Sequence, residues 1–292
     1  MYTDIQKRWR LFANVWQGMD WLLLLLPVSL VIFGAVVIHS TQKNLNTSYG
    51  WNHVLLGAIG LVIALWLSRT RYEHLLSLQW IIYGVVNLLL VAVIFVGTVG
   101  SGAQRWITIF GFNVQPSEFA KLGVIITLAA ILSRRNASTL WGVMTAVAVT
   151  AVPWSLVFIQ PDLGTSLVFG AITVGMLYWA NCNPGWLLLL VSPVVAAILF
   201  HLTIPIWLLW SVGMGVVAWM TLPWRWFSTV IATAVNLICG KIGDVFWGLL
   251  QDYQKDRLIL FLDPDKDPLG GGYHLIQSRI AIGAGKLWGQ GL

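Results

Sequence analysis

Long uncharged apolar runs constrain the fold more than any other feature of this sequence. The first, from Trp21 to Ile38, contains no Asp, Glu, Lys or Arg, and comparable runs recur along nearly the whole chain. A helix of roughly 20 apolar residues can cross about 30 Å of hydrocarbon with its backbone polar groups paired internally. Charged residues make up 10% of the chain, well below the usual share in a soluble domain. We therefore expect an all-α, polytopic membrane protein.

The spacing of these runs predicts nine transmembrane helices in one membrane domain, residues 1–292. We expect the spans at 19–39, 51–68, 76–98, 117–133, 140–159, 163–180, 186–203, 206–222 and 227–248. Residues 1–18 form a hydrophilic cytoplasmic head. No small-residue cleavage site follows the first span, which indicates a retained helix and not a signal peptide. Residues 249–292 then begin a large extracytoplasmic loop.

Basic residues between the runs predict the orientation of the chain, because cytoplasmic loops of membrane proteins are enriched in Lys and Arg. With the N-terminus in the cytoplasm, the short outer loops hold only Lys43 and Arg105. The inner side then holds Lys7, Arg8, Arg10, Arg69, Arg71, Arg134, Arg135 and Arg225. An odd number of spans places the chain from about Gln251 onward outside. The basic residues form no patch, so we expect no nucleic-acid partner.

The ninth run leaves two alternatives open, because it contains Lys241 and Asp244. The two residues are spaced i,i+3 and could pair on one helical face. Alternatively, the helix protrudes into the outer head groups. Both alternatives leave the following loop outside.

The first group of chemically capable residues lies between the third and fourth spans. It comprises Gly102-Ala103-Gln104-Arg105-Trp106, an outer loop, and Gln115-Pro116-Ser117-Glu118-Phe119-Ala120-Lys121. Pro116 and Glu118 predict a helix start, with Glu118 and Lys121 as i,i+3 neighbours. One reading is an ordinary interfacial helix start with a snorkelling lysine. The other is that Arg105 and Lys121 bind an anionic head group, such as a lipid-linked phosphate.

The second group is a tight outer turn between the fifth and sixth spans. It reads Gln160-Pro161-Asp162-Leu163-Gly164-Thr165-Ser166. Asp at this position is typical of the N-cap of the next helix. A contact in a polar site is the alternative role for Asp162.

The third group is an acidic segment in the predicted large outer loop, and its Pro and Gly content indicates a sharply turned chain. Asp263, Asp265 and Asp267 crowd together there. Crowded carboxylates repel one another, which can make one of them a better base. Their oxygens could equally hold a hard divalent cation such as Mg²⁺ or Mn²⁺, with Asp263 and Asp265 as candidate ligands. A solvated acidic loop is the third alternative.

In this order and topology, the groups resemble the SEDS family (shape, elongation, division and sporulation) of bacterial cell-wall polymerases, and within it the rod-shape-determining members. The resemblance runs from Trp21 to the end. Besides the motifs above it rests on Asp267-Pro268-Leu269-Gly270-Gly271-Gly272-Tyr273-His274-Leu275-Ile276-Gln277-Ser278. The family's essential acid, in its Asp-Pro-x-Gly-x-Gly-Tyr motif, corresponds to Asp267, which the resemblance implies is catalytic. It implies substrate-binding roles for Arg105, Trp106, Gln115, Glu118, Lys121 and Asp162.

The resemblance also implies a function. A SEDS polymerase is a peptidoglycan glycosyltransferase that joins lipid II, an undecaprenyl-diphosphate-linked disaccharide peptide, into glycan strands during cell elongation and the maintenance of rod shape. It would be a multi-pass protein of the bacterial cytoplasmic (inner) membrane. Its partners would be a class B penicillin-binding protein, which is a transpeptidase, and other membrane proteins of the elongation complex.

Two departures from the family pattern and two competing functions remain. Three apolar runs stand between residues 186 and 248 where the family has one span, which we interpret as an inserted helical pair. The chain also stops at Leu292, where the family continues, which we interpret as a truncation. A flippase for a lipid-linked sugar would need polar groups near the membrane midplane, whereas these spans are almost uncharged. A non-catalytic scaffold for the transpeptidase is the other alternative.

Overall fold

The fold comes from a computed structural model of the chain. The residues that it describes are 20–41, 49–100, 103–109, 112–134, 138–249, 255–256, 260, 265, 267–270, 272–286 and 289. The chain forms two compact units, one comprising Met1–Arg71 with Ala284–Leu292 and the other Tyr72–Gly283.

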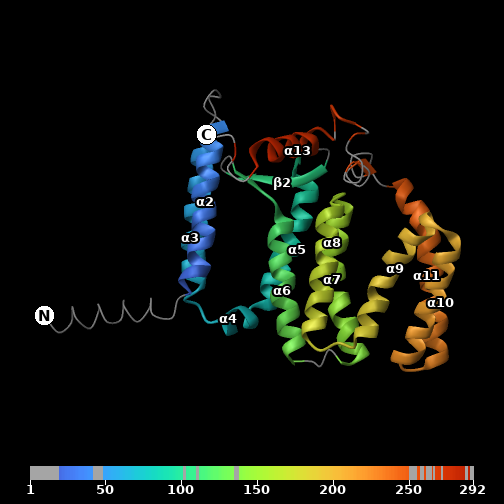
Figure 1. The fold of residues 1–292 in the computed structure, drawn as a ribbon. Helices are drawn as coiled ribbons and strands as arrows, with labels where there is room; N and C mark the ends of the chain where they lie inside the picture. Colours follow the sequence, from blue (N-terminus) through green and yellow to red (C-terminus); the bar gives the residue numbers. More distant parts are fainter. Residues whose placement is uncertain are drawn as a thin grey trace, which may run out of the picture. The chain divides into compact units, whose positions relative to one another are not determined.

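The first unit contains a helical hairpin of α2 (Trp21–Thr41) and α3 (Tyr49–Leu67) (Figure 1). Asp20 begins α2, because its carboxylate accepts hydrogen bonds of 3.0 and 3.2 Å from two backbone amides of the first turn. The two helices approach closely at Gly57, where a Cβ atom would collide with the side chain of Val31. Small residues permit this kind of close packing between helices in a membrane.

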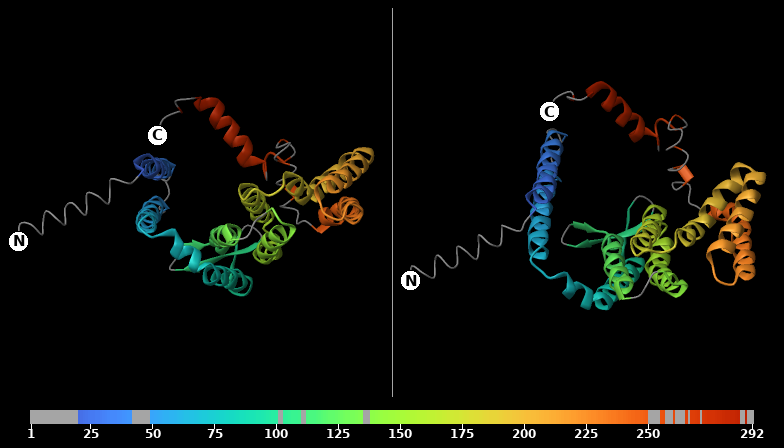
Figure 2. Two further views of the ribbon diagram at one scale, coloured as in Figure 1. Left: turned by 90° about the horizontal axis from the view of Figure 1, so that it is seen from below. Right: turned by 60° about the horizontal axis from the view of Figure 1, so that its bottom comes forward.

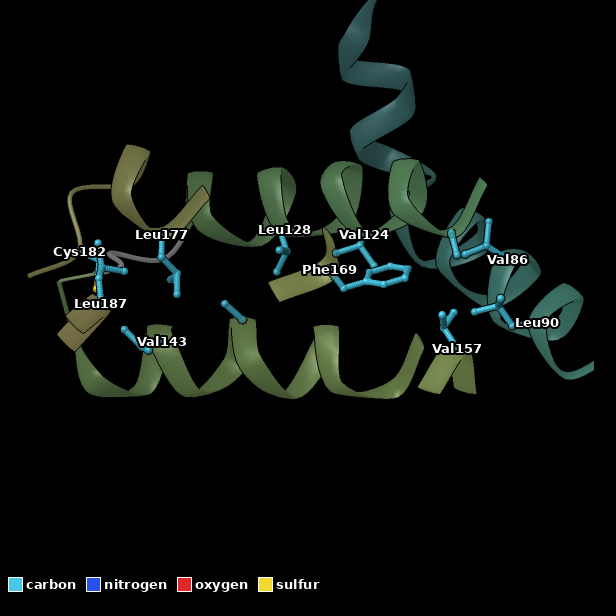
Figure 3. Close-up of a cluster of buried hydrophobic side chains, with 12 residues drawn as sticks. Val86, Leu90, Val124, Leu128, Val143, Val157, Phe169, Leu177, Cys182 and Leu187 are labelled. Atoms are coloured by element: carbon cyan, nitrogen blue, oxygen red, sulfur yellow. The ribbon is translucent and has the colours of Figure 1, made fainter. Parts of the chain in front are cut away.

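The second unit begins with a bundle whose core is apolar. Its helices are α4 (Tyr72–Ser77), α5 (Gln79–Val96), α6 (Pro116–Arg134), α7 (Leu140–Ile159) and α8 (Leu163–Trp179). Phe169 of α8 is fully buried and belongs to one buried cluster with Leu90 of α5 and Val124 of α6 (Figure 3). A Cβ on Gly123 would lie 2.8 Å from Val86 Cγ2, so glycine there lets α5 and α6 come together.

Three further helices of this unit pack against one another (Figure 2). They are α9 (Pro184–Leu202), α10 (Ile204–Thr221) and α11 (Arg225–Leu249). Asn236 of α11 donates a 3.0 Å hydrogen bond to the hydroxyl of Ser192 in α9, and its backbone carbonyl accepts from the indole of Trp207 in α10 at 3.3 Å. That indole also lies where a Cβ on Gly240 would be. One polar residue therefore joins all three helices.

The helices confirm the predicted polytopic membrane fold, since each of the nine predicted runs contains one of them. Eight helices in the described part of the chain have the length and composition of membrane spans, and α8 has 17 residues. The third run differs at its start, because α5 begins only at Gln79, after the separate α4. Lys241 lies within α11, and the side chain of Asp244 is outside the described part of the structure.

The segment between α5 and α6 differs from the outer loop expected there, because it forms a small antiparallel sheet. Its strands are β1 (Thr98–Gly100), β2 (Ala103–Ile109) and β3 (Phe112–Val114), in the order β1-β2-β3. The register pairs Thr98 with Trp106 and Ile107 with Val114. The sheet contacts α5 and α6 and lies at their upper ends in Figure 1.

Candidate active site

Arg105 points from β2 into the turn between α7 and α8. Its Nη2 donates to the carbonyl oxygen of Pro161 at 2.5 Å, and its Nε donates to that of Gln160 at 3.4 Å. Helix α7 ends at Ile159, and the last carbonyls of a helix lack intrahelical partners and carry partial negative charge. Arg105 binds the carbonyls of the two residues that directly follow this helix end and is only 9% exposed.

Asp162 provides the negative charge of the same cluster. Its Oδ1 lies 3.6 Å from Nη1 of Arg105 and accepts a 3.2 Å hydrogen bond from the backbone amide of Thr165. Its Oδ2 accepts from the Thr165 hydroxyl at 2.9 Å. Asp162 is 6% exposed and is the N-cap of α8, which confirms the predicted capping role. The cation thus lies at the negative end of one helix and the anion at the positive end of the next.

Three glutamine side chains connect this charge pair to the surrounding helices. Gln115, just before α6, donates to Asp162 Oδ2 at 3.2 Å. Gln160 donates to the carbonyl of Leu90 in α5 at 3.0 Å, and Gln104 of β2 donates to that of Gly97 at 2.6 Å. The C-terminal ends of α5 and α7 and the N-terminal ends of α6 and α8 are therefore linked by polar contacts.

Glu118 and Lys121 form a second charge pair, on the first turns of α6. Their Oε1 and Nζ atoms are 2.8 Å apart, which confirms the predicted i,i+3 pairing and the predicted helix start at Pro116. The Glu118 side chain is 55% exposed and that of Lys121 is 22% exposed. Trp106, beside Arg105 on β2, is half-buried. Lys121 can therefore reach an anion at the surface more directly than Arg105 can.

Ser117 is a buried polar residue that sequence reasoning missed. Among the described residues its hydroxyl has no hydrogen-bond partner, although the residue is only 2% exposed. Buried hydroxyls are usually satisfied by protein or by ordered water. Ser117 lies in the first turn of α6, between the site residues Gln115 and Glu118 in the sequence. Serine at the start of a helix is too common to have drawn attention to it.

Asp267 lies in a turn that leads into α13 (Tyr273–Gly285). Its Oδ1 accepts a 3.0 Å hydrogen bond from the backbone amide of Gly270, and its carbonyl accepts one of 3.0 Å from the amide of Gly272. The carboxylate group of Asp267 occupies the space that a Cβ atom on Gly270 would need. The residue is exposed. The turn thus holds an accessible carboxylate in a defined orientation.

The predicted cation site at Asp263 and Asp265 stays a prediction. Asp265 is exposed, and Asp263 lies outside the described residues. In the part of the chain that the structure describes, no three His, Cys, Asp or Glu side chains lie close enough to hold a metal.

Comparison with known proteins identifies the family. The family model described as a cell cycle protein, FtsW/RodA/SpoVE, matches residues 18–209 and 203–292. The chain belongs to this family. The FtsW/RodA/SpoVE match therefore covers α2 to α13, including the buried charge cluster and the Asp267 turn.

Curated members of the FtsW/RodA/SpoVE family include close relatives of this chain. The peptidoglycan glycosyltransferase MrdB of Escherichia coli is 31% identical over 276 residues, which are 94% of this chain and 62% of the relative. The peptidoglycan glycosyltransferase RodA of Treponema pallidum is 30% identical, over 93% of this chain and 70% of the relative. The chain thus spans about two thirds of the length of these relatives.

Two solved structures resemble the fold. One is a chain from a study titled as the structural coordination of polymerization and crosslinking by a peptidoglycan synthase complex. It has a TM-score of 0.58 and 26% identity, covering 91% of this chain and 66% of that one. The other is the rod-shape-determining protein RodA of Thermus thermophilus, with a TM-score of 0.53 and 28% identity over 59% of this chain and 57% of that one.

Proposed function

We propose that this protein is a peptidoglycan glycosyltransferase that polymerises lipid II during cell elongation. The observation that carries the proposal is the Asp267 turn, an exposed carboxylate held by the Gly270 amide within the Asp-Pro-x-Gly-x-Gly-Tyr motif. Support comes from two relatives in the FtsW/RodA/SpoVE family, MrdB and RodA, that bear this activity in their names.

The proposed reaction is glycosyl transfer with inversion of configuration. The Asp267 carboxylate takes the proton of the acceptor sugar hydroxyl as that oxygen attacks the anomeric carbon of the donor. The bond between the anomeric carbon and the diphosphate oxygen breaks, and the lipid diphosphate leaves with the electron pair. The reaction therefore requires a base on one side of the donor and positive charge on the other.

Lys121 is the cation that we place beside the departing diphosphate. It is partly exposed on α6, and Glu118 holds its ammonium group in position. The predicted phosphate contact of Arg105 stays part of the proposal, although its guanidinium is bound to two carbonyls and paired with Asp162. We therefore give Arg105, Gln115 and Asp162 the additional role of positioning the sheet and the start of α6. Trp106, half-buried next to Arg105 on β2, stays a proposed substrate contact.

The proposal includes the setting of the enzyme. The site would face the outside of the bacterial cytoplasmic membrane, with the N-terminus in the cytoplasm, as the distribution of Lys and Arg predicts. A class B penicillin-binding protein would crosslink the strands that this protein makes. One structural relative is a chain from work on a peptidoglycan synthase complex that coordinates polymerization and crosslinking, which supports this partner.

One purified-protein assay separates this function from its two alternatives. The protein at its full natural length is reconstituted in vesicles with lipid II, with and without a class B penicillin-binding protein. We expect glycan strands, measured by gel electrophoresis. Transfer of lipid II between leaflets without strands would establish the flippase instead. Binding of the transpeptidase without either reaction would establish the scaffold.

Gly270→Ala should reduce this polymerisation by about 10²-fold, because displacing a catalytic group by about 1 Å costs a rate factor of that size. A Cβ on Gly270 collides with the carboxylate of Asp267. Gly283→Ala in α13 is the matched control, since its Cβ would meet no described atom within 4 Å. Strand synthesis by the two variants is measured at equal folded protein. Equal activities would show that Gly270 does not position Asp267.

A further inference from the structure

An apolar groove lies between the C-terminal parts of α6 and α8, away from the charge cluster. Its volume is about 530 Å³. The residues that line it are Ala129, Leu132, Ser133, Gly175, Met176, Trp179 and Ala180. Pockets that hold small molecules usually have volumes of about 300–1,000 Å³. The groove is thus large enough for part of a lipid chain.

The groove exists because small residues leave space between the two helices. A Cβ on Gly175 would meet no described atom within 4 Å, and Ala129 and Ala180 add only one methyl group each. Met176 contributes an unbranched side chain that adapts to an irregular apolar shape. Both helices belong to the membrane bundle, so a hydrocarbon chain of the bilayer is an apolar ligand that suits this space.

Charge and aromatic character at the helix ends beside the groove indicate which lipid fits. Arg134 is the last residue of α6 and directly follows Ser133 of the lining. It is exposed and forms no ion pair with any residue that the structure describes. Trp179, the last residue of α8, is 86% exposed. Arginine and tryptophan at helix ends are typical of the membrane–water interface, and arginine there attracts anionic lipid.

The groove is separate from the proposed active site. Arg105, Glu118 and Lys121 lie at the N-terminal end of α6, whereas Ser133 and Arg134 lie at its C-terminal end. Helix α6 has 19 residues and is therefore about 28 Å long. The basic residues near Arg134 predict that this end faces the cytoplasm. The two sites would thus face opposite leaflets.

We propose that this groove binds one acyl chain of an anionic phospholipid from the cytoplasmic leaflet, with the lipid phosphate beside Arg134. The inference is independent of the proposed catalytic function. It rests on the apolar lining of the groove, the open space at Gly175 and the exposed cation Arg134, which follows the lining residue Ser133.

Native mass spectrometry of the protein released from mixed phosphatidylglycerol and phosphatidylethanolamine vesicles tests the proposal. We expect the wild type to retain phosphatidylglycerol preferentially. Gly175→Leu fills the groove and should lower retention by more than about tenfold, since each lost methylene contact weakens apolar binding severalfold. Gly170→Leu is the matched control, because Gly170 also lies exposed on α8 with open space around it but does not line the groove.

A second variant tests the head group. Arg134→Gln should reduce the preference for phosphatidylglycerol over phosphatidylethanolamine about fivefold, the contribution of one basic residue near an anionic surface. Equal retention by the two leucine variants would overturn the groove as the site. Equal retention of both lipids by the wild type would overturn the anionic head group. Stronger retention of a polyprenyl phosphate than of phosphatidylglycerol would assign the groove to the lipid carrier instead.

Discussion

Asp267→Asn should lower the rate of lipid II polymerisation by about 10²–10⁴-fold, the usual contribution of a general base. The amide oxygen of asparagine can still accept the hydrogen bond from the Gly270 amide, so the turn keeps its shape. It cannot take up the proton of the acceptor hydroxyl. Single-turnover strand synthesis in vesicles measures the effect, and Asp267→Ala should give at least as large a loss.

The controls separate lost chemistry from lost folding. Asp256→Asn changes another exposed acid of the segment after α11 and should leave the rate within about twofold, as surface substitutions usually do. Elution of each variant as a monodisperse protein in detergent shows that the membrane domain has folded. Full activity of a folded Asp267→Ala protein would refute the assignment of the base.

Arg105→Ala and Asp162→Ala should each destabilise the bundle by about 3–5 kcal/mol, because each leaves its partner buried and uncompensated. Arg105 is 9% and Asp162 6% exposed, so water does not replace the lost contact. The double variant should lose much less than the sum of the two, since it leaves no unpaired charge. Thermal unfolding in detergent, followed by size-exclusion fluorescence, measures all three.

Asp162→Asn is the matched control for this pair. Its amide oxygen preserves the cap on the Thr165 amide but removes the charge, so its loss of stability reports the ion pair together with the hydrogen bonds that Oδ2 accepts from Gln115 and the Thr165 hydroxyl. If Arg105→Ala melts like the wild type and loses only substrate affinity, Arg105 binds substrate and does not support the fold. This experiment therefore decides between the two roles open for Arg105.

The helices of this protein could be predicted well because most spans are continuous apolar runs. Such a run can be recognised in the sequence without knowing which helices it packs against, because the bilayer itself requires an apolar helix. The start of α6 and the cap of α8 were predictable for a related reason. Pro116 starts α6, Glu118 pairs with Lys121 and Asp162 caps the Thr165 amide, all within one turn, so these roles depend on local sequence.

The sheet and the partners of Arg105 could not be predicted in this way. The strand β2 contains β-branched residues such as Ile107 and Thr108, which favour strands. It has only seven residues, however, so this signal is weak beside the long apolar helices. Arg105 binds the backbone carbonyls of Gln160 and Pro161, 55 and 56 positions away. Every residue has a backbone carbonyl, so the identity of the side chains at Gln160 and Pro161 does not predict this contact.

The hydrogen bonds of Asn236 bear on how the chain is made. Helix α11 has the lowest mean hydropathy of the eight candidate spans, and Asn236 lies near its middle. A polar side chain makes the insertion of an isolated helix less favourable, whereas here the Asn236 side-chain amide donates to Ser192 of α9 and the Asn236 backbone carbonyl accepts from Trp207 of α10. We therefore expect α11 to insert into the bilayer together with α9 and α10 during biosynthesis. If α11 failed to enter, everything after it would remain on the opposite side of the membrane. The side on which Asp267 lies therefore depends on the contacts of Asn236 with α9 and α10.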